Sequence, residues 1–145
     1  FLKLGRREGI KLKEIFNLVI PELVDIMRIQ RCALFAVMED RQHVVLEAGF
    51  PEEKHGIGAV FSVKEPYIDA IVNQRGPFGE FPNEKIYPTH ILIHNPQESP
   101  LLPPDLKRFL KSQETNSVLY IPLKVSEVVN YFLVFDAQAY HRRKD

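Results

Sequence analysis

The sequence predicts an α+β domain in which helices flank a central antiparallel β-sheet. A long amphipathic helical pattern opens the chain, and pairs of adjacent strand-like runs follow that helix and end the chain. Consecutive strands with short connections pair antiparallel, and helices then cover the sheet. A length of 145 residues, with 45% hydrophobic and 26% charged residues, fits one globular domain, so we treat residues 1–145 as a single domain.

The first element is an amphipathic helix over residues 10–29. Its apolar positions recur with the helical period and form one broad arc: Leu12, Ile15, Phe16, Val19, Ile20, Leu23, Ile26 and Met27. Pro21 lies on the polar face, so we expect a kink with the helix continuing beyond it. Leu18 and Ile29 fall outside the arc; they are either scattered exposed residues or a contact with another helix or a second copy of the chain. We expect a homodimer with this helix in its interface.

The remaining elements follow from apolar runs separated by turn residues. In order they are strands 32–38, 44–50 and 59–63, helix 66–74, strand 90–94, helix 106–113, and strands 117–124 and 128–137. The connection at residues 125–127 lacks the glycine of a tight turn, so its geometry stays open.

A proline-rich segment covers residues 77–104 and holds seven of the eleven prolines. Because proline fixes φ and removes a backbone donor, we expect an ordered loop interrupted by one short strand. Long structured loops often carry function, so we expect this one to border a pocket. The polar residues 138–145 are expected to be a linker or the start of a further helix. The chain begins with Phe1, and we interpret it as a piece of a longer protein.

Charge and composition exclude several classes of function. Nineteen Lys and Arg balance nineteen Asp and Glu, so there is no electrostatic footprint for nucleic acid or an anionic membrane. No apolar run reaches the roughly 20 residues of a spanning helix, so we expect no membrane insertion by this segment. The single cysteine excludes an internal disulfide framework and a zinc site built on several thiolates.

Catalytic motifs are also missing. The pair Gly56 and Gly58 lacks the third glycine and the lysine of nucleotide-binding loops, and no serine stands in a G-x-S-x-G motif. Acidic pairs such as Glu39 and Asp40 fall in predicted turns and are expected to be solvated. We therefore expect that this chain is not an enzyme.

The histidines His90 and His94 are the most tempting metal ligands. The apolar residues between them and the prolines around them favour a strand, along which four residues span about 13 Å. This is too far for one shared ion, so we expect no metal site. Each histidine either lines a pocket or sits at a strand end.

The lone cysteine, Cys32, allows several roles: nucleophile, redox sensor, anchor of a covalent cofactor, or buried structural residue. It starts an apolar strand, where a free cysteine behaves as a small hydrophobic residue. Desolvation raises the pKa of a thiol and disfavours the reactive thiolate. We expect Cys32 to be buried and unreactive.

Aromatic residues gather around the middle helix and the proline-rich segment: Phe50, Phe61, Tyr67, Phe78, Phe81 and Tyr87. Ordinary core packing and an enclosed ligand pocket explain this clustering equally well. In the pocket hypothesis the ligand-binding residues are Phe61, Tyr67, Phe78, Tyr87, His90 and His94, the aromatic residues as walls and the histidines as polar contacts. Few cations lie in this layer, so we expect a small, mostly apolar or aromatic ligand rather than a highly phosphorylated one.

The chain resembles the GAF family of sensory domains over most of its length. The opening helix, the strand at residues 31–40, and the second strand ending in Gly49 are similar to the family's first elements. The segment Asn116-Ser-Val-Leu-Tyr-Ile-Pro-Leu123 is the best single match, with a small residue, an apolar run and then Pro-Leu. PAS domains share much of this architecture, but the Pro122-Leu123 ending favours GAF. In the last strand, Asn130 stands where the family usually has glycine.

The resemblance implies a cytoplasmic sensory or regulatory module that binds a small molecule within a larger signalling protein. Such proteins include histidine kinases, cyclic-dinucleotide enzymes and transcription activators. The alternative is a degenerate domain that has no small ligand and serves for dimerisation. The motifs of the family's cyclic-nucleotide-binding, bilin-binding and methionine sulfoxide reductase members are not found, and the ligand and any cofactor remain unassigned.

Overall fold

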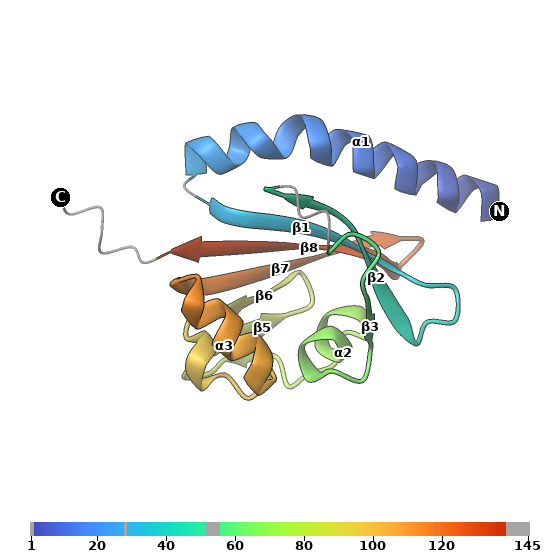
Figure 1. Cartoon of the computed structure of the whole chain (residues 1–145). Coiled ribbons are helices and arrows are strands. Elements are labelled where there is room, and N and C mark those ends of the chain that lie inside the picture. Colours follow the sequence, from blue (N-terminus) through green and yellow to red (C-terminus); the bar gives the residue numbers. More distant parts are fainter. Residues whose placement is uncertain (1, 28, 52–55, 139–145) are drawn as a thin grey trace.

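The computed structural model describes residues 2–27, 29–51 and 56–138. Within these ranges, groups of two or three consecutive strands are separated by helices (Figure 1). The helices are α1 (Leu2–Met27), α2 (Pro66–Val72), a short 3-10 helix η1 (Pro96–Glu98) and α3 (Pro104–Ser112). The strands are β1 (Ile29–Val37), β2 (His43–Phe50), β3 (Val60–Ser62), β4 (Gly79–Glu80), β5 (Glu84–Tyr87), β6 (His90–Ile93), β7 (Thr115–Val125) and β8 (Val128–Gln138).

All eight of these strands form one antiparallel sheet in the order β3-β2-β1-β8-β7-β6-β5-β4. The first strand pairs with the last, which joins the two halves of the chain at the centre of the sheet. Helix α1 arches over one face, while α2 and α3 lie on the opposite face (Figure 1). The predicted α+β class and the central antiparallel sheet flanked by helices are confirmed.

Each face of the sheet has its own apolar core. On the α1 side, Phe16 and Ile20 pack against Cys32, Leu34 and Ala48 of β1 and β2. The larger core lies on the other side, between the sheet and the helices α2 and α3. The two cores follow from the strand period of two, which sends Leu34 to one face of β1 and Phe35 to the other.

Helix α1 differs in its bounds from the predicted helix 10–29. It starts at Leu2 and ends at Met27, and Pro21 lies inside it as expected. Ile29, which we placed in the helix, opens β1 instead, so this strand begins three residues before the predicted position at Cys32. The difference brings Gln30 and Arg31 into the sheet.

The proline-rich segment contains more regular structure than expected. Besides the predicted strand near residues 90–94, it forms β4 and β5, which extend the sheet beyond β6. The prolines of this segment lie outside its strands, where no ladder hydrogen bond is lost; Pro82 separates β4 from β5, Pro88 lies in the turn before β6, and Pro96 and Pro104 begin η1 and α3. Of the predicted C-terminal linker, residues 139–145 lie outside the described residues. None of the described helices is both long and apolar enough to cross a bilayer.

Candidate functional site

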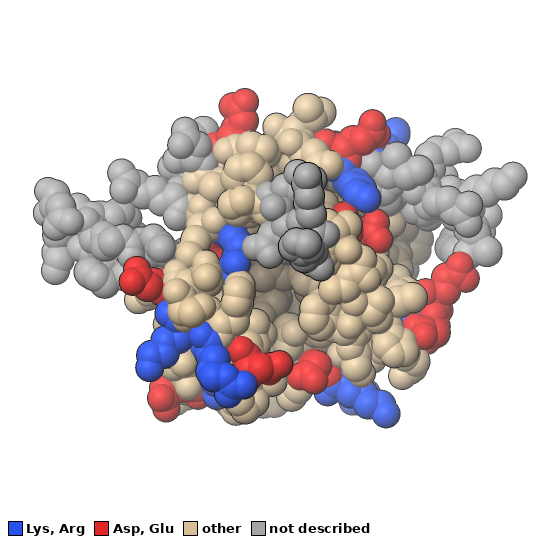
Figure 2. All heavy atoms as spheres, viewed as in Figure 1, with Lys and Arg blue, Asp and Glu red and all other residues tan. Residues whose placement is uncertain are grey.

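A pocket of about 210 Å³ lies between the sheet and the helices α2 and α3. We call it the sheet–helix pocket. Figure 2 shows the surface hollowed between the regions of these two helices, with walls that are mostly uncharged. Its lining residues are Arg31, Ala33, Phe35, Phe61, Tyr67, Ile68, Leu106, Phe109, Leu110, Val118, Tyr120, Phe132, Val134 and Asp136.

Strand alternation and cross-strand register build the floor of the pocket. Alternate residues of β1, β8 and β7 face α2 and α3, and the register sets them side by side. Ala33 pairs with Val134, and Val134 pairs in turn with Tyr120 on the next strand. Arg31 pairs with Asp136 in the same way. A row of apolar floor residues therefore ends in a pair of opposite charges.

Aromatic rings form much of the wall. Phe35 and Phe132 stack with centroids 4.9 Å apart and planes 8° from parallel. Phe61 meets Phe35 edge to face at 5.9 Å, and Tyr67 lies 5.7 Å from Tyr120. These rings touch one another but do not fill the space between them, since the pocket remains open.

Two tyrosine hydroxyls are the notable polar groups inside this wall. Tyr120 is only 3% exposed, and neither its hydroxyl nor that of Tyr67 has a hydrogen-bond partner among the described residues. Burial, then the nearby Tyr67 and Asp136, raises the pKa of Tyr120 well above its ordinary value. Burial, then Glu65 and Asp105, raises the pKa of Tyr67 to about 12. Both phenols, which would be protonated at neutral pH even without these shifts, therefore stay protonated and able to donate at higher pH as well.

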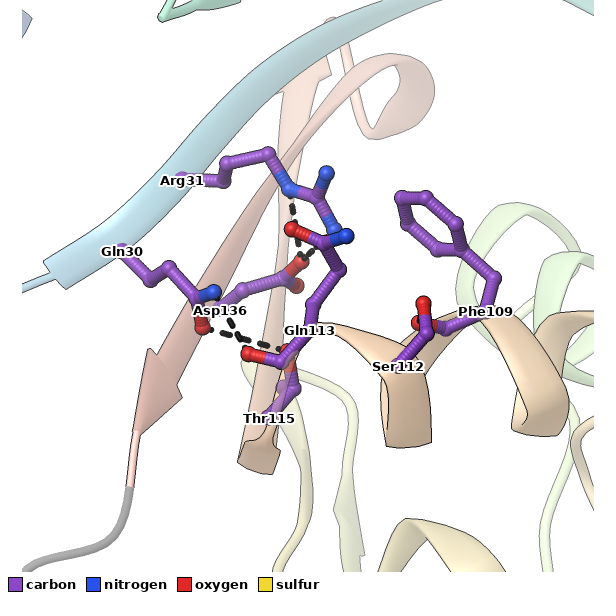
Figure 3. Close-up of polar contacts among 7 residues, drawn as sticks. All are labelled: Gln30, Arg31, Phe109, Ser112, Gln113, Thr115 and Asp136. Atoms are coloured by element: carbon purple, nitrogen blue, oxygen red, sulfur yellow. Dashed lines mark hydrogen bonds and ion pairs between the residues drawn. The ribbon is translucent and has the colours of Figure 1, made fainter.

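An ion pair between Arg31 and Asp136 forms the charged end of the pocket (Figure 3). Nε and Nη2 of Arg31 both donate to Oδ2 of Asp136, at 3.3 and 3.2 Å. The Arg31 guanidinium also lies over the ring of Phe109 on α3, 4.3 Å from its centroid. Both partners are largely buried, with 17% and 10% of their side chains exposed. Arg31 thus connects the floor of the pocket to its helical wall.

A second set of contacts ties the end of α3 to the start of β1 (Figure 3). Gln30 donates from Nε2 to the carbonyl of Gln113 at 2.7 Å, and Thr115 donates from Oγ1 to Oε1 of Gln30 at 3.2 Å. Gln113 is the residue directly after α3, and Gln30 stands near the start of β1, just beyond α1. The Gln30 side chain therefore joins the end of α3, a wall of the pocket, to the start of β1, the strand that follows α1.

A smaller cavity of about 70 Å³ adjoins the pocket. It shares Arg31, Ala33, Val134 and Asp136 with the sheet–helix pocket, so the ion pair borders both spaces. The space available beside the ion pair therefore extends toward the end of β2.

Two of the six predicted ligand-binding residues, Phe61 and Tyr67, line the sheet–helix pocket. The structure does not bring the other four to it. In β5 and β6 the buried residues Ile86, Ile91 and Ile93 point to the core beneath α2 and α3, so the alternate residues point to the other face. Tyr87 and His90 are such alternate residues, and their rings contact each other at 5.5 Å.

The remaining two predicted residues lie in connections. Phe78, between α2 and β4, is 47% exposed, and His94, directly after β6, is exposed. We expected the proline-rich segment at residues 77–104 to border the pocket, whereas the helical walls of the sheet–helix pocket are α2 and α3. The proline-rich segment instead extends the sheet, which is why its aromatic residues do not converge on the pocket.

Sequence reasoning missed Arg31 at the start of β1 and the residues that the second half of the chain contributes, above all Phe109, Tyr120 and Asp136. One signal was present in the sequence. Asp136 has the same strand parity as Phe132 and Val134, which makes it a charged residue on a buried face of β8. Such a residue needs a partner of opposite charge, and Arg31 supplies it.

Cys32 lies on the α1 side of the sheet and is 2% exposed. Burial, then the charge of Asp136, raises the pKa of this thiol to about 12, and a hydrogen bond from the backbone of Ala33 opposes the shift. The predicted burial is confirmed. Cys32 is the only cysteine of the chain and does not line the sheet–helix pocket.

No protein-family model matches the sequence, and no curated protein does. Solved structures are similar at the level of the fold. The GAF domain of a phosphoenolpyruvate-protein phosphotransferase from Coxiella burnetii has a TM-score of 0.65 at 17% identity, covering 94% of this chain and 76% of that one. The domain of a GAF/HD protein from Geobacter sulfurreducens has a TM-score of 0.63 at 14% identity, covering 87% and 74%.

The phycocyanobilin-bound GAF domain of a cyanobacterial phytochrome is also similar, with a TM-score of 0.56 at 12% identity over 94% of this chain and 76% of that one. These similarities show the fold. The chain has the fold of GAF domains, as the resemblance of its strand segments predicted.

Proposed function

We propose that this GAF-fold chain is a cytoplasmic sensory module of a longer signalling protein and that it binds a small molecule in the sheet–helix pocket. The observation that carries the proposal is the pocket itself. Its aromatic residues would close the space if they served only as core, yet about 210 Å³ remains between the sheet and the two helices. The structure thus supports the pocket hypothesis over ordinary core packing, and the proposal assigns no catalytic role.

The contacts around the pocket support a route for the signal. Phe109 of α3 lines the pocket and stacks on Arg31, while Gln30 bonds the end of α3. Gln30 and Arg31 stand at the start of β1, just after α1. A ligand that displaces α3 would therefore shift the contacts of the strand that follows α1. A ligand changes a two-state equilibrium only by binding the states differently, and α3 is the element whose position it would bias. Histidine kinases, cyclic-dinucleotide enzymes and transcription activators are the proteins in which we place such a module.

A pocket-filling variant tests the proposal. Ala33 lines the floor of the pocket, and Ala33→Leu places a larger side chain into the space. Ala36→Leu is the matched control, because Ala36 lies on the same strand but has the opposite parity. We expect a library of small aromatic fragments to shift NMR signals of Ile68, Leu110 and Val118 in the wild type and the control. The shifts should be lost in Ala33→Leu; their persistence there would contradict binding in this pocket.

Dimerisation is the second candidate function, and α1 favours it. The sheet-facing stripe of α1 contains the buried residues Phe16 and Ile20. Beside it, Ile15, Leu18 and Val19 are 55%, 76% and 43% exposed. A continuous exposed apolar surface on a long helix fits a second copy of the same helix, with which it can pack ridges into grooves.

Sedimentation of the chain tests dimerisation. We expect a dimer at micromolar concentration, converted to monomer by Leu18→Glu. Asn17→Glu introduces the same charge at an adjacent exposed position and should leave the dimer intact. A monomer in the wild type at high micromolar concentration would overturn this second function.

A further inference from the structure

We infer that the ligand of the sheet–helix pocket is a neutral aromatic molecule of one substituted ring that carries a hydrogen-bond acceptor for the Tyr120 and Tyr67 hydroxyls. This inference rests on the proposed function and adds the chemical class of the ligand to it.

The acceptor follows from the unpaired hydroxyls. Tyr120 is only 3% exposed, and its hydroxyl has no hydrogen-bond partner among the described residues. No fully enclosed side-chain nitrogen or oxygen in the described part of the chain lacks a partner, so this hydroxyl still contacts solvent. The pocket that Tyr120 lines is the route by which solvent reaches it. A ligand that expels this water without replacing its hydrogen bond leaves a buried donor unsatisfied, which costs free energy.

The donor role of these hydroxyls is fixed by their protonation. A phenol is protonated at neutral pH, and burial, which raises the pKa of Tyr67 and of Tyr120, keeps both in that form at higher pH as well. The lone pairs of a phenol oxygen delocalise into its ring, so a protonated phenol donates better than it accepts. The centroids of the two rings lie 5.7 Å apart and both residues line the pocket, so both phenols are candidate donors to one ligand.

Neutrality follows from the charges that line the pocket. Among the described residues that line the pocket, Arg31 and Asp136 are the ionisable groups besides the tyrosines, and they form an ion pair with each other. A charged ligand would have to break this pair or remain buried without a counter-ion, and either event is costly in an apolar environment. The pair therefore disfavours carboxylates, phosphates and ammonium ions.

Size and shape follow from the volume and the rings. A cavity of about 150 Å³ lined by aliphatic and aromatic residues holds benzene in another protein. The 210 Å³ here therefore accommodates one ring with a short substituent. Phe35, Phe61 and Phe109 offer ring edges and faces to a planar partner. Pockets for larger ligands begin at about 300 Å³, so nucleotides and tetrapyrroles are too large.

Three probes of similar shape test the inference by NMR titration: acetophenone, isopropylbenzene and benzoate. Acetophenone is neutral and has a carbonyl acceptor, isopropylbenzene is its apolar analogue, and benzoate is its charged analogue. We expect acetophenone to bind about five- to tenfold more tightly than isopropylbenzene, the effect of one neutral hydrogen bond. We expect benzoate to bind more weakly than either.

Hydroxyl deletions identify the donor. Tyr120→Phe combined with Tyr67→Phe should abolish the preference for acetophenone and leave the affinity for isopropylbenzene unchanged. Tyr87→Phe removes a hydroxyl outside the pocket and is the control. If isopropylbenzene binds as tightly as acetophenone in the wild type, or if benzoate binds most tightly, the ligand class is wrong while the pocket function stands. If no probe binds in the pocket, the proposed function fails and the inference fails with it.

Discussion

At the scale of single residues, Arg31 shows how one side chain serves both stability and the site. Its guanidinium donates twice to Asp136 and stacks on Phe109, so it joins β1, β8 and α3. A lysine in its place keeps the charge but has neither the planar stacking surface nor the fork of donors. The wall of the pocket therefore depends on the shape of the guanidinium as much as on its charge.

We predict that Arg31→Lys lowers the free energy of unfolding by about 1 kcal/mol, because the stacking on Phe109 and one of the donors are lost. Urea denaturation measures the change. Arg75→Lys is the matched control, since Arg75 pairs with Asp69 but has 68% of its side chain exposed. The control should change stability by less than about 0.5 kcal/mol. Equal effects of the two substitutions would show that Arg31 acts only as a charge.

Cys32 gives a second prediction at this scale. Its pKa is raised from 9.0 to about 12, so the native thiol should not react with a disulfide reagent at pH 8, while the chain in concentrated urea should react at once. A folded pKa above the unfolded one means that the contribution to stability is complete below pH 9 and is lost as the pH rises toward 12. Rapid labelling of the native protein at pH 8 would contradict this account.

At the scale of elements, the β7–β8 hairpin closes the fold through a strained turn. Val125 pairs with Val128, and the two residues between them, Ser126 and Glu127, have φ of 53° and 68°. Two central residues at positive φ are typical of a type I′ turn, which matches the twist of the strands and favours Asn-Gly. The sequence did not predict the geometry of this turn, because the turn lacks glycine. The pairing of β7 with β8, rather than the turn residues, determines that geometry.

We predict that Ser126→Asn combined with Glu127→Gly raises the free energy of unfolding by about 1 kcal/mol, since both residues then suit the left-handed region. Thermal denaturation measures the gain. Lys124→Gly, in the strand beside the turn, is the control and should destabilise the domain, because glycine there only adds freedom to the unfolded chain. A loss of stability in the double variant would exclude strain at this turn.

At the scale of the whole molecule, the sequence predicted the fold better than the site. Helices and strands leave periodic signals in the chain, so the first two strands and the last two were located within a few residues, and the long first helix was found although it begins at Leu2 rather than at residue 10. The site depends on register between distant segments: Arg31 and Asp136 are 105 positions apart. The one signal for this pairing in a single sequence is that Asp136 shares a strand face with the apolar residues Phe132 and Val134. The aromatic clustering pointed instead to the proline-rich segment, whose Phe78 and Tyr87 do not line the sheet–helix pocket.

The same long-range contacts lead to the last prediction, which concerns coupling across the domain. Gln30 bonds the carbonyl of Gln113 and accepts from Thr115, so it fixes the end of α3 to β1. In Gln30→Ala both hydrogen bonds are lost, at a cost of about 1 to 2 kcal/mol. We expect amide exchange at Gln113 and along α3 to accelerate by about tenfold, since 1.4 kcal/mol corresponds to a factor of ten.

Amide exchange in β2, whose residues take no part in these two hydrogen bonds, should stay unchanged in Gln30→Ala. Gln42→Ala, a substitution in the exposed connection between β1 and β2, is the control and should leave exchange unchanged throughout the domain. Uniform acceleration over the whole sheet would indicate general destabilisation rather than a local tether. No acceleration in α3 would remove the proposed connection between the pocket wall and α1. A selective effect on α3 would mean that the helix lining the sheet–helix pocket is fixed by β1, the strand that follows α1 in the chain.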